Sequence, residues 1–271
     1  MIYVRRYYAA LLMMASAGSL AAGTLLTVRV DSGRGGSILT HEIRVQCQHV
    51  RMDTLTEDLK QAVLYNNETR SLLVVNEEKK IFRRVSQEDA ERQRQSQTEK
   101  QEQFRERIER RIRNLPPEKQ SAMRKMLNRR FDSGDESRME CRRVSEGERV
   151  GSWSAERYEC FVGSRRVREI WSVPWEKTGL DLEEAVVLQG FMHMRGGTSR
   201  GPRPGGGIGG FPIAAEAFPG LAVQSAEVRA DDTQRGHEIS SIEREDFDAT
   251  LFSVDGSYTE AAAGSFMVPI R

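Results

Sequence analysis

Alternation of apolar and polar positions is the main pattern along this chain. Between residues 37 and 50, Leu39, Ile43, Val45 and Cys47 fall on one side of a period-two pattern. Such a pattern predicts one long half-buried strand, with Cys47 as a packed core thiol. Residues 62–85 predict three further strands, because apolar runs there are separated by Asn-rich turn signals.

The remaining strands follow the same pattern at either end of the chain. They are expected at residues 24–30, 139–147, 154–162, 165–173, 211–218, 221–230 and 236–244. About eleven strands without strand–helix alternation predict an α+β fold built on a mostly antiparallel sheet. We expect one domain over residues 27–258, followed by a C-terminal tail at 259–271.

A polar helical arm is expected as an insertion at residues 86–133. Ser86 and Asp89 suit a helix start, and Phe104, Ile108, Ile112 and Leu115 recur at helical spacing only in the second half. A second helix should begin at Pro116-Pro117, with Met123, Met126, Leu127 and Phe131 as its apolar side. The pattern predicts an arm that is solvated at its start and packed near its end. A coiled-coil seam is less favoured, because residues 87–103 lack the apolar positions that it needs.

A second helical region covers residues 179–194, and Asp181 suits its N-cap. Its apolar positions predict a helix that covers the sheet. These positions are Leu182, Ala185, Val186, Leu188, Phe191 and Met192. Residues 196–210 contain eight Gly and two Pro, which predicts an irregular loop.

The first 21 residues resemble an export signal. Arg5 and Arg6 precede an apolar core, and small residues follow it, so cleavage is expected after Ala21. The alternative is an uncleaved anchor, because apolar character continues to Val28. The first Cys is Cys47, so a lipoprotein is not expected. We expect a periplasmic or secreted protein with no integral membrane domain after cleavage.

Composition and charge narrow the function classes. The chain of 271 residues is 38% hydrophobic and carries 41 Lys+Arg against 40 Asp+Glu. Because the net charge is close to zero, the protein has no overall positive potential that would attract nucleic acid, which is not expected as a partner. In an oxidising compartment, Cys141 and Cys160 could pair across a hairpin that turns near Val150 and Gly151. Two unrelated buried thiols are the alternative.

Motifs for catalysis lack their structural context. Gly197–Gly201 fits the GxSxG pattern around Ser199, but Pro202 follows where a helix should begin. Gly205–Gly210 fits GxGxxG, but Phe211-Pro212 follows it. We therefore expect neither enzyme activity nor a cofactor.

Metal ligands are also sparse in the sequence. Soft ligands near His49 and His193 could suit copper, but they fall on different predicted elements. We therefore expect no metal site.

Several ordered segments resemble the bacterial domain-of-unknown-function family 4412. They include "LLVVNEEKKIFRRVSQED" (72–89), "NLPPEKQSAMRKML" (114–127), "GERVGSWSAERYE" (147–159), "VREIWSVPWEKTGL" (167–180) and "ISSIEREDFDATLFSVDGSY" (239–258). Ser154 and Ala155 stand where members often carry Cys, so a family disulfide does not transfer. The resemblance implies the lipoprotein-carrier fold, a curved sheet wrapped around helices as an open half-barrel, without an established activity.

That fold suggests a concave apolar face for an acyl chain or another hydrophobic ligand. The candidate lining residues are Leu39, Ile43, Val45, Leu73, Val75, Trp171, Val173, Val186 and Phe191. The alternative is that the same residues form a filled core. A second hypothesis is an envelope interaction or scaffold protein that uses the arm at 86–115. A third is a hydrolase that uses Ser199 or one of the four histidines.

Overall fold

The computed structural model describes residues 22–31, 38–55, 60–132, 139–199, 218–228 and 235–261. Their strands form one twelve-stranded sheet. The strands are β1 (Ala22–Asp31), β2 (Ile38–Gln46), β3 (His49–Leu55), β4 (Lys60–Asn66), β5 (Ser71–Asn76), β6 (Ile81–Ser86), β7 (Met139–Val150), β8 (Trp153–Val162), β9 (Arg165–Val173), β10 (Leu221–Glu227), β11 (Arg235–Asp246) and β12 (Thr259–Glu260).

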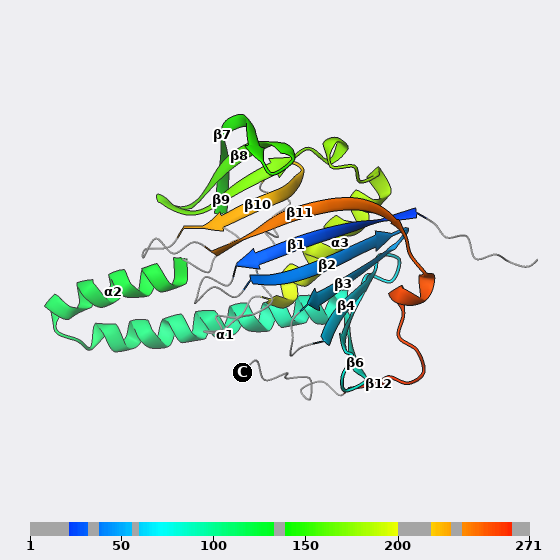
Figure 1. The fold of residues 1–271 in the computed structure, drawn as a ribbon. Coiled ribbons are helices and arrows are strands. Elements are labelled where there is room, and N and C mark those ends of the chain that lie inside the picture. The colour runs from blue at the N-terminus through cyan, green and yellow to red at the C-terminus, as the bar shows by residue number, and fades with distance from the viewer. Residues whose placement is uncertain are drawn as a thin grey trace, which may run out of the picture.

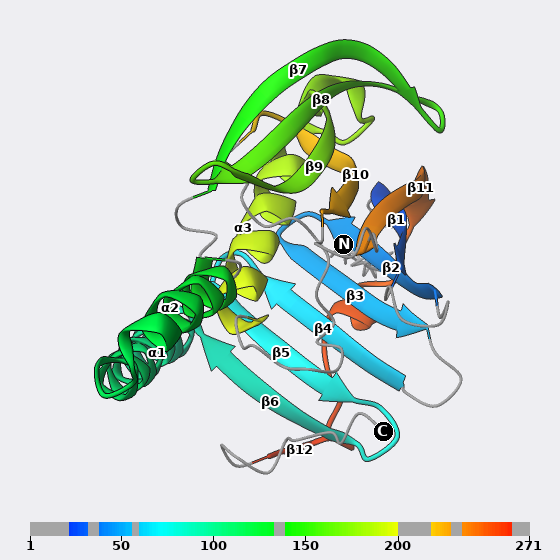
Figure 2. The ribbon, with the colours of Figure 1, turned by 90° about the vertical axis from the view of Figure 1, so that its left-hand side faces the viewer.

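The order in the sheet is β12-β6-β5-β4-β3-β2-β1-β11-β10-β9-β8-β7. Neighbouring strands are antiparallel except for β12, which pairs with β6 in parallel. The sheet is open and strongly curved (Figures 1 and 2). These observations confirm the predicted fold class. The sheet begins at Ala22 and takes in Thr259–Glu260, so it extends beyond the expected limits of 27 and 258 at both ends.

The helices are α1 (Gln87–Arg113), α2 (Pro117–Asp132) and α3 (Leu182–Ser199), with short 3-10 turns η2 (Trp175–Lys177) and η3 (Ala249–Phe252). Helix α3 lies on the concave side of the curved sheet (Figure 2). It continues to Ser199, so the expected loop start at residue 196 is wrong. The predicted export signal at 1–21, residues 200–210 of the predicted loop and residues 211–217 of the predicted strand at 211–218 lie outside the described residues.

The predicted long strand at 37–50 is two strands. A tight turn at Cys47 and Gln48 joins β2 to β3, and Cys47 has φ 49° in the left-handed region. Its side chain is exposed. The prediction of a packed core thiol is therefore wrong. A turn residue of this kind gives no Gly, Asn or Pro signal in the sequence.

The hairpin β7–β8 decides between the two alternatives that the sequence leaves open for Cys141 and Cys160. It turns at Gly151 and Ser152, and Cys141 lies directly opposite Cys160 in the register. The two cysteines form a disulfide. Strand β7 is the last strand of the sheet, so the disulfide ties this edge strand to its neighbour.

A second apolar cluster covers the outer face of the sheet near β4 and β5. Ala62, Leu64 and Val75 are buried there, with Leu73, Phe82, Val254 and Tyr258 packed against them. Arg51 fixes the nearby chain by donating a hydrogen bond of 3.0 Å to the carbonyl oxygen of Leu251. The C-terminal segment therefore gives these strands two covered faces.

The arm formed by α1 and α2 extends away from the sheet (Figure 1). Ser86 and Asp89 form the predicted capping box. Ala90, in the first turns of α1, is fully buried in the main core, which the sequence did not predict, whereas Glu88, Glu91 and Arg92 beside it are exposed as expected. Ile112 is buried near the turn into α2, but Phe104 is 43% exposed. Met123 is half-buried, and the side chains of Met126, Leu127 and Phe131 lie outside the described ones.

Candidate functional site

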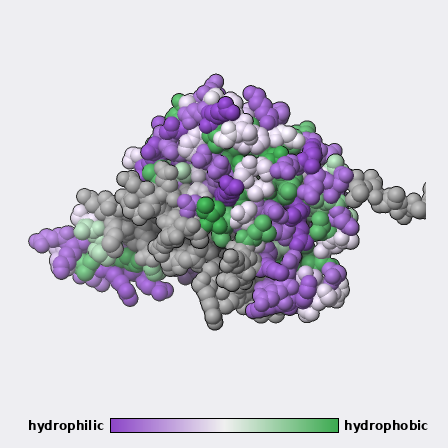
Figure 3. Space-filling model, viewed as in Figure 1, coloured by the Kyte–Doolittle hydropathy of each residue, from purple (hydrophilic) through white to green (hydrophobic). Residues whose placement is uncertain are grey.

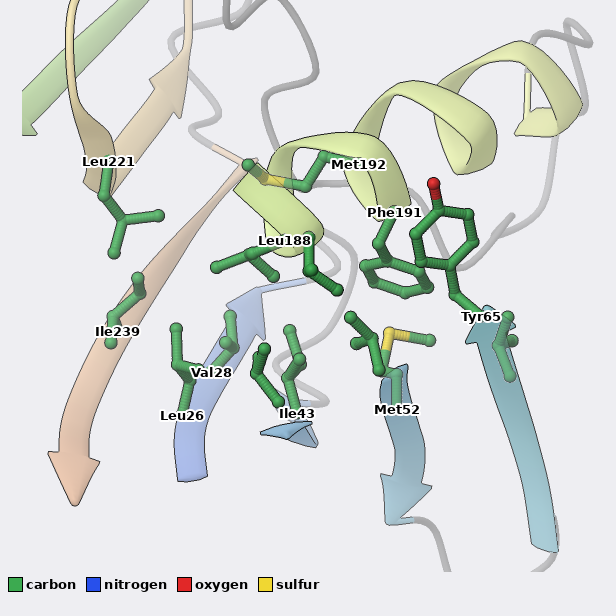
Figure 4. Packing of buried hydrophobic residues seen from close by; sticks show 14 of the residues in the cluster. Leu26, Val28, Ile43, Met52, Tyr65, Leu188, Phe191, Met192, Leu221 and Ile239 are labelled. Carbon is green, nitrogen blue, oxygen red and sulfur yellow. The ribbon is translucent and has the colours of Figure 1, made fainter. Parts of the chain in front are cut away.

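The concave face is an apolar wall built by alternate residues of several strands. Leu26 and Val28 come from β1, Ile43 and Val45 from β2, and Met52 from β3, and each is at most 1% exposed. Alternation places all of them on the same side of the sheet. Figure 4 shows Leu188 and Phe191 of α3 pointing into this wall. The wall and one side of α3 form a single buried cluster.

The N-terminal end of α3 is tied to the sheet by Glu184, which is 3% exposed. Its carboxylate accepts hydrogen bonds from the Thr24 hydroxyl at 3.0 and 2.9 Å and from Arg244 Nη1 at 2.7 Å. Glu184 also completes a capping box with Asp181, whose Oδ1 accepts the Glu184 N–H at 2.8 Å. Charge therefore fixes one end of a helix whose inner side is apolar.

The C-terminal end of α3 brings a cation beside the same wall. Arg195 Nη1 lies 2.8 Å from Met52 Sδ, and burial lowers the pKa of Arg195 to about 10. His41 is 2% exposed and its Nδ1 lies 3.1 Å from Thr54 Oγ1. Burial and the charge of Arg195 lower the pKa of His41 to about 4, so this imidazole is neutral at pH 7.

Six of the nine predicted lining residues belong to the main buried cluster or pack against it. Ile43, Val45, Val173 and Phe191 belong to the main buried cluster. Leu39 and Trp171 are half-buried and pack against it. The structure brings these six together in one buried cluster, to which α3 contributes Phe191.

Three predicted lining residues lie elsewhere. Leu73 and Val75 belong to the cluster on the outer face, beneath the C-terminal segment. Val186 is 51% exposed, whereas its neighbour Val187 is 1% exposed and belongs to the core. Leu182, which was expected on the same apolar side of the helix, is 79% exposed. The prediction that these residues lie on the concave face was wrong. Both faces of β5 are covered, so alternation does not show which face is concave. Val186 and Val187 are adjacent, so helical spacing does not show which of them is buried.

Several residues of the face were not among the candidates. They are Leu26, Val28, Met52, Tyr65, Met192 and Met194. The alternation in β1 could have identified Leu26 and Val28. Met52 was missed because the turn at Cys47 was not predicted, so β3 was not recognised as a separate strand. Met52, Met192 and Met194 are buried in this cluster, and the flexible side chain of Met fills irregular gaps in a core.

A buried serine–histidine pair lies between β10 and β11. Ser225 Oγ is 2.7 Å from His237 Nδ1, and His237 Nε2 is 3.2 Å from the carbonyl oxygen of Ala222. The two residues are 5% and 2% exposed, so a substrate cannot reach the hydroxyl without opening the sheet. The arrangement therefore indicates a structural role. Sequence reasoning missed it, because the pair depends on cross-strand register.

A charged and aromatic cluster occupies the β7–β9 end of the sheet. Arg157 bridges Glu159 and Glu169 at 3.4 and 3.0 Å, and Trp171 Nε1 donates to Glu148 at 2.8 Å. Hydrogen bonds from Ser145 and Trp171 lower the pKa of Glu148. These groups bind one another, which indicates that the cluster holds the three strands together.

Neither of the sequence candidates for copper gains support. Met192 and Met194 are buried, whereas His193 is exposed. Cys47 is exposed at its turn, while His49 Nε2 lies 3.1 Å from Asn66 Nδ2. Within the described ranges, His, Cys, Asp and Glu form no group of three or more that could hold a metal ion. No helix in the described ranges has both the length and the apolar character needed to cross a membrane.

Comparisons with known proteins give no assignment. The chain matches no family profile and no curated protein. Among solved structures, it is similar to PNGF-II in the C2 and P21 crystal forms, with TM-scores of 0.40 and 0.39 and 10% identity in both cases. The similarity covers 90% of this chain but 31% and 32% of the PNGF-II chains. The resemblance to family 4412 therefore stays a prediction.

Proposed function

We propose that this is an exported, non-catalytic protein that holds a hydrophobic ligand, such as an acyl chain, between α3 and the concave face of its sheet. The observation that carries the proposal is the position of α3 over the concave face of the sheet (Figure 2). In the part of the chain that the structure describes, helix α3 lies over an apolar wall that includes Ile43, Val45 and Met52. Displacing this helix would open a continuous apolar surface for a ligand chain.

The polar contacts of α3 are compatible with such a movement. Its start is held by Glu184, through Thr24 and Arg244, while Leu188 and Phe191 make apolar contacts farther along the helix. Apolar contacts are non-directional, so a ligand chain can replace them without leaving a hydrogen bond unmade. The Glu184 end would then act as the fixed end of a movable cover.

A fluorescent polyene fatty acid tests this proposal as a probe. The wild-type protein should bind it saturably, with about one site. Phe191→Trp, which adds volume at the middle of the face, should weaken binding about tenfold or more, as expected for overpacking of about 1–3 kcal/mol. Leu182→Trp is the matched control, because Leu182 lies on the exposed side of the same helix.

The outcome is decided by the two variants together. Circular dichroism first establishes that each variant is folded, and Ile43→Trp replaces Phe191→Trp if the latter is not. Absence of saturable binding to the wild type, or equal weakening in Leu182→Trp, would overturn the proposal.

A further inference from the structure

Basic residues are concentrated in the far part of the arm. Residues 105–131, termed the distal arm, contain ten Lys or Arg residues and three Glu residues. The whole chain has a formal net charge of +1, so the distal arm is +7 and the remainder is −6. The near balance of the whole composition conceals this separation of charge.

The basic side chains of the distal arm are available at its surface. Seven of them are both described and exposed: Arg105, Arg107, Arg110, Arg111, Arg113, Lys119 and Arg124. Arg105 pairs with Glu109 at 3.4 Å and Arg110 with Glu106 at 3.7 Å. Among the described residues, Arg107, Arg111 and Arg113 form no ion pair. The positive charge of the distal arm is therefore largely uncompensated.

The arm presents this charge away from the acidic remainder of the molecule. Helices α1 and α2 extend beyond the sheet (Figures 1 and 2). Hydrophilic residues mark the far end of the arm in the space-filling view (Figure 3). Screening confines charge effects to about 8–10 Å at physiological salt, so an extended anionic surface would attract the distal arm before it repelled the body.

We propose that the distal arm docks on the surface of an anionic phospholipid bilayer. Eight of its ten basic residues are Arg, whose planar fork binds phosphate oxygens in pairs. Phe104 is 43% exposed at the edge of the basic region, where an aromatic ring suits the boundary between headgroups and acyl chains. The inference is independent of a ligand in the concave face.

A membrane suits these features better than other polyanions. The basic residues surround α1 and continue onto α2 without a repeated spacing, so they suit a fluid array of phosphates more than a shaped protein partner. Export, proposed above, places the chain with membranes rather than with nucleic acid. An acidic protein and a nucleic acid are therefore the outcomes that the experiment must separate from a bilayer.

Vesicle co-sedimentation tests the proposal with the full chain. Vesicles of phosphatidylcholine alone are compared with vesicles containing phosphatidylglycerol, at low and high salt. Binding should require phosphatidylglycerol and weaken strongly with salt. Arg107→Gln/Arg111→Gln/Arg113→Gln should weaken binding about 100-fold.

A second triple variant controls for net charge. Arg142→Gln/Arg149→Gln/Arg165→Gln removes the same charge from exposed positions of β7–β9 and should bind like the wild type. Equal loss in both triple variants would overturn the proposal. So would absence of binding to phosphatidylglycerol vesicles, or tighter binding to a DNA oligonucleotide or to polyglutamate than to those vesicles.

Discussion

The Thr24 hydroxyl of β1 donates to both carboxylate oxygens of Glu184 in the first turn of α3, at 3.0 and 2.9 Å. The two residues are 160 positions apart in the chain. Arg244 of β11 binds the same carboxylate at 2.7 Å. This junction joins α3 to β1 and β11, two neighbouring strands near the middle of the sheet.

Removing the Glu184 carboxylate should destabilise the fold. Glu184→Ala leaves the buried Thr24 hydroxyl without its acceptor and leaves Arg244 with only Asp181, at 3.6 Å, so we expect a loss of about 1–3 kcal/mol in the free energy of unfolding. Glu183→Ala, at the exposed neighbouring position, should stay within about 0.5 kcal/mol of the wild type. Urea unfolding monitored by circular dichroism measures both. Similar losses in the two variants would contradict the assigned junction.

Adjacent valines test the rotation of α3 about its axis. Val187→Ala removes two buried methyl groups and should cost about 1–2 kcal/mol, whereas Val186→Ala should change stability by less than about 0.5 kcal/mol. Urea midpoints of the two variants give the comparison directly. A larger effect at Val186 would show that the sequence-based placement on the apolar side was right.

The disulfide predicts a simple pattern of thiol labelling. Native protein should take up one iodoacetamide group, at the exposed Cys47, and reduced and unfolded protein should take up three. Three labels on unreduced protein would exclude the bond.

The same disulfide should contribute to stability. Cys141→Ser/Cys160→Ser should lower the free energy of unfolding by about 3 kcal/mol, because cysteines 19 positions apart close a loop in the unfolded chain. Cys47→Ser is the control and should have almost no effect. Urea unfolding under non-reducing conditions distinguishes the variants.

His41 makes stability depend on pH. Burial and the charge of Arg195 lower its pKa in the folded protein from 6.5 to about 4, whereas the unfolded chain keeps the usual value. The unfolded state therefore binds the proton more tightly, and the stability present above pH 6.5 is lost as the pH falls toward 4. The loss from this group is about 3 kcal/mol.

Replacing His41 should remove that part of the pH dependence. His41→Gln should be less stable than the wild type at pH 7, and the gap should narrow toward pH 4.5, because only the wild type loses the histidine contribution. His193→Gln, at an exposed position, should follow the wild type throughout. Parallel curves for His41→Gln and the wild type would contradict the assignment.

The sequence predicted the sheet well because its signals are local. Gly151 marked the turn of the β7–β8 hairpin, and alternation located the strands. Cys47 carried no such signal, because its left-handed backbone conformation is determined by the two strands that it joins. The candidate site was predicted less completely. Alternation separates Leu73 from Leu72 but cannot tell which face is covered by α3, because the C-terminal segment covers the other.

Burial along the arm was also predicted incompletely. A single Ala90 among polar residues gives no signal of burial, yet its small side chain lets the start of α1 approach the core closely. Phe104 looked like a core residue by spacing but is exposed, because its part of the arm extends beyond the sheet. Helical periodicity describes one side of a helix and not whether another element lies beside it.

Native mass spectrometry of the full chain, purified without detergent from the envelope of a bacterial host, tests the central claim most directly. The account predicts a protein ion that carries one hydrophobic molecule, which is released on unfolding and is depleted in Phe191→Trp but not in Leu182→Trp. A protein ion of the bare polypeptide mass, unchanged after incubation with fatty acids and phospholipids, would contradict it.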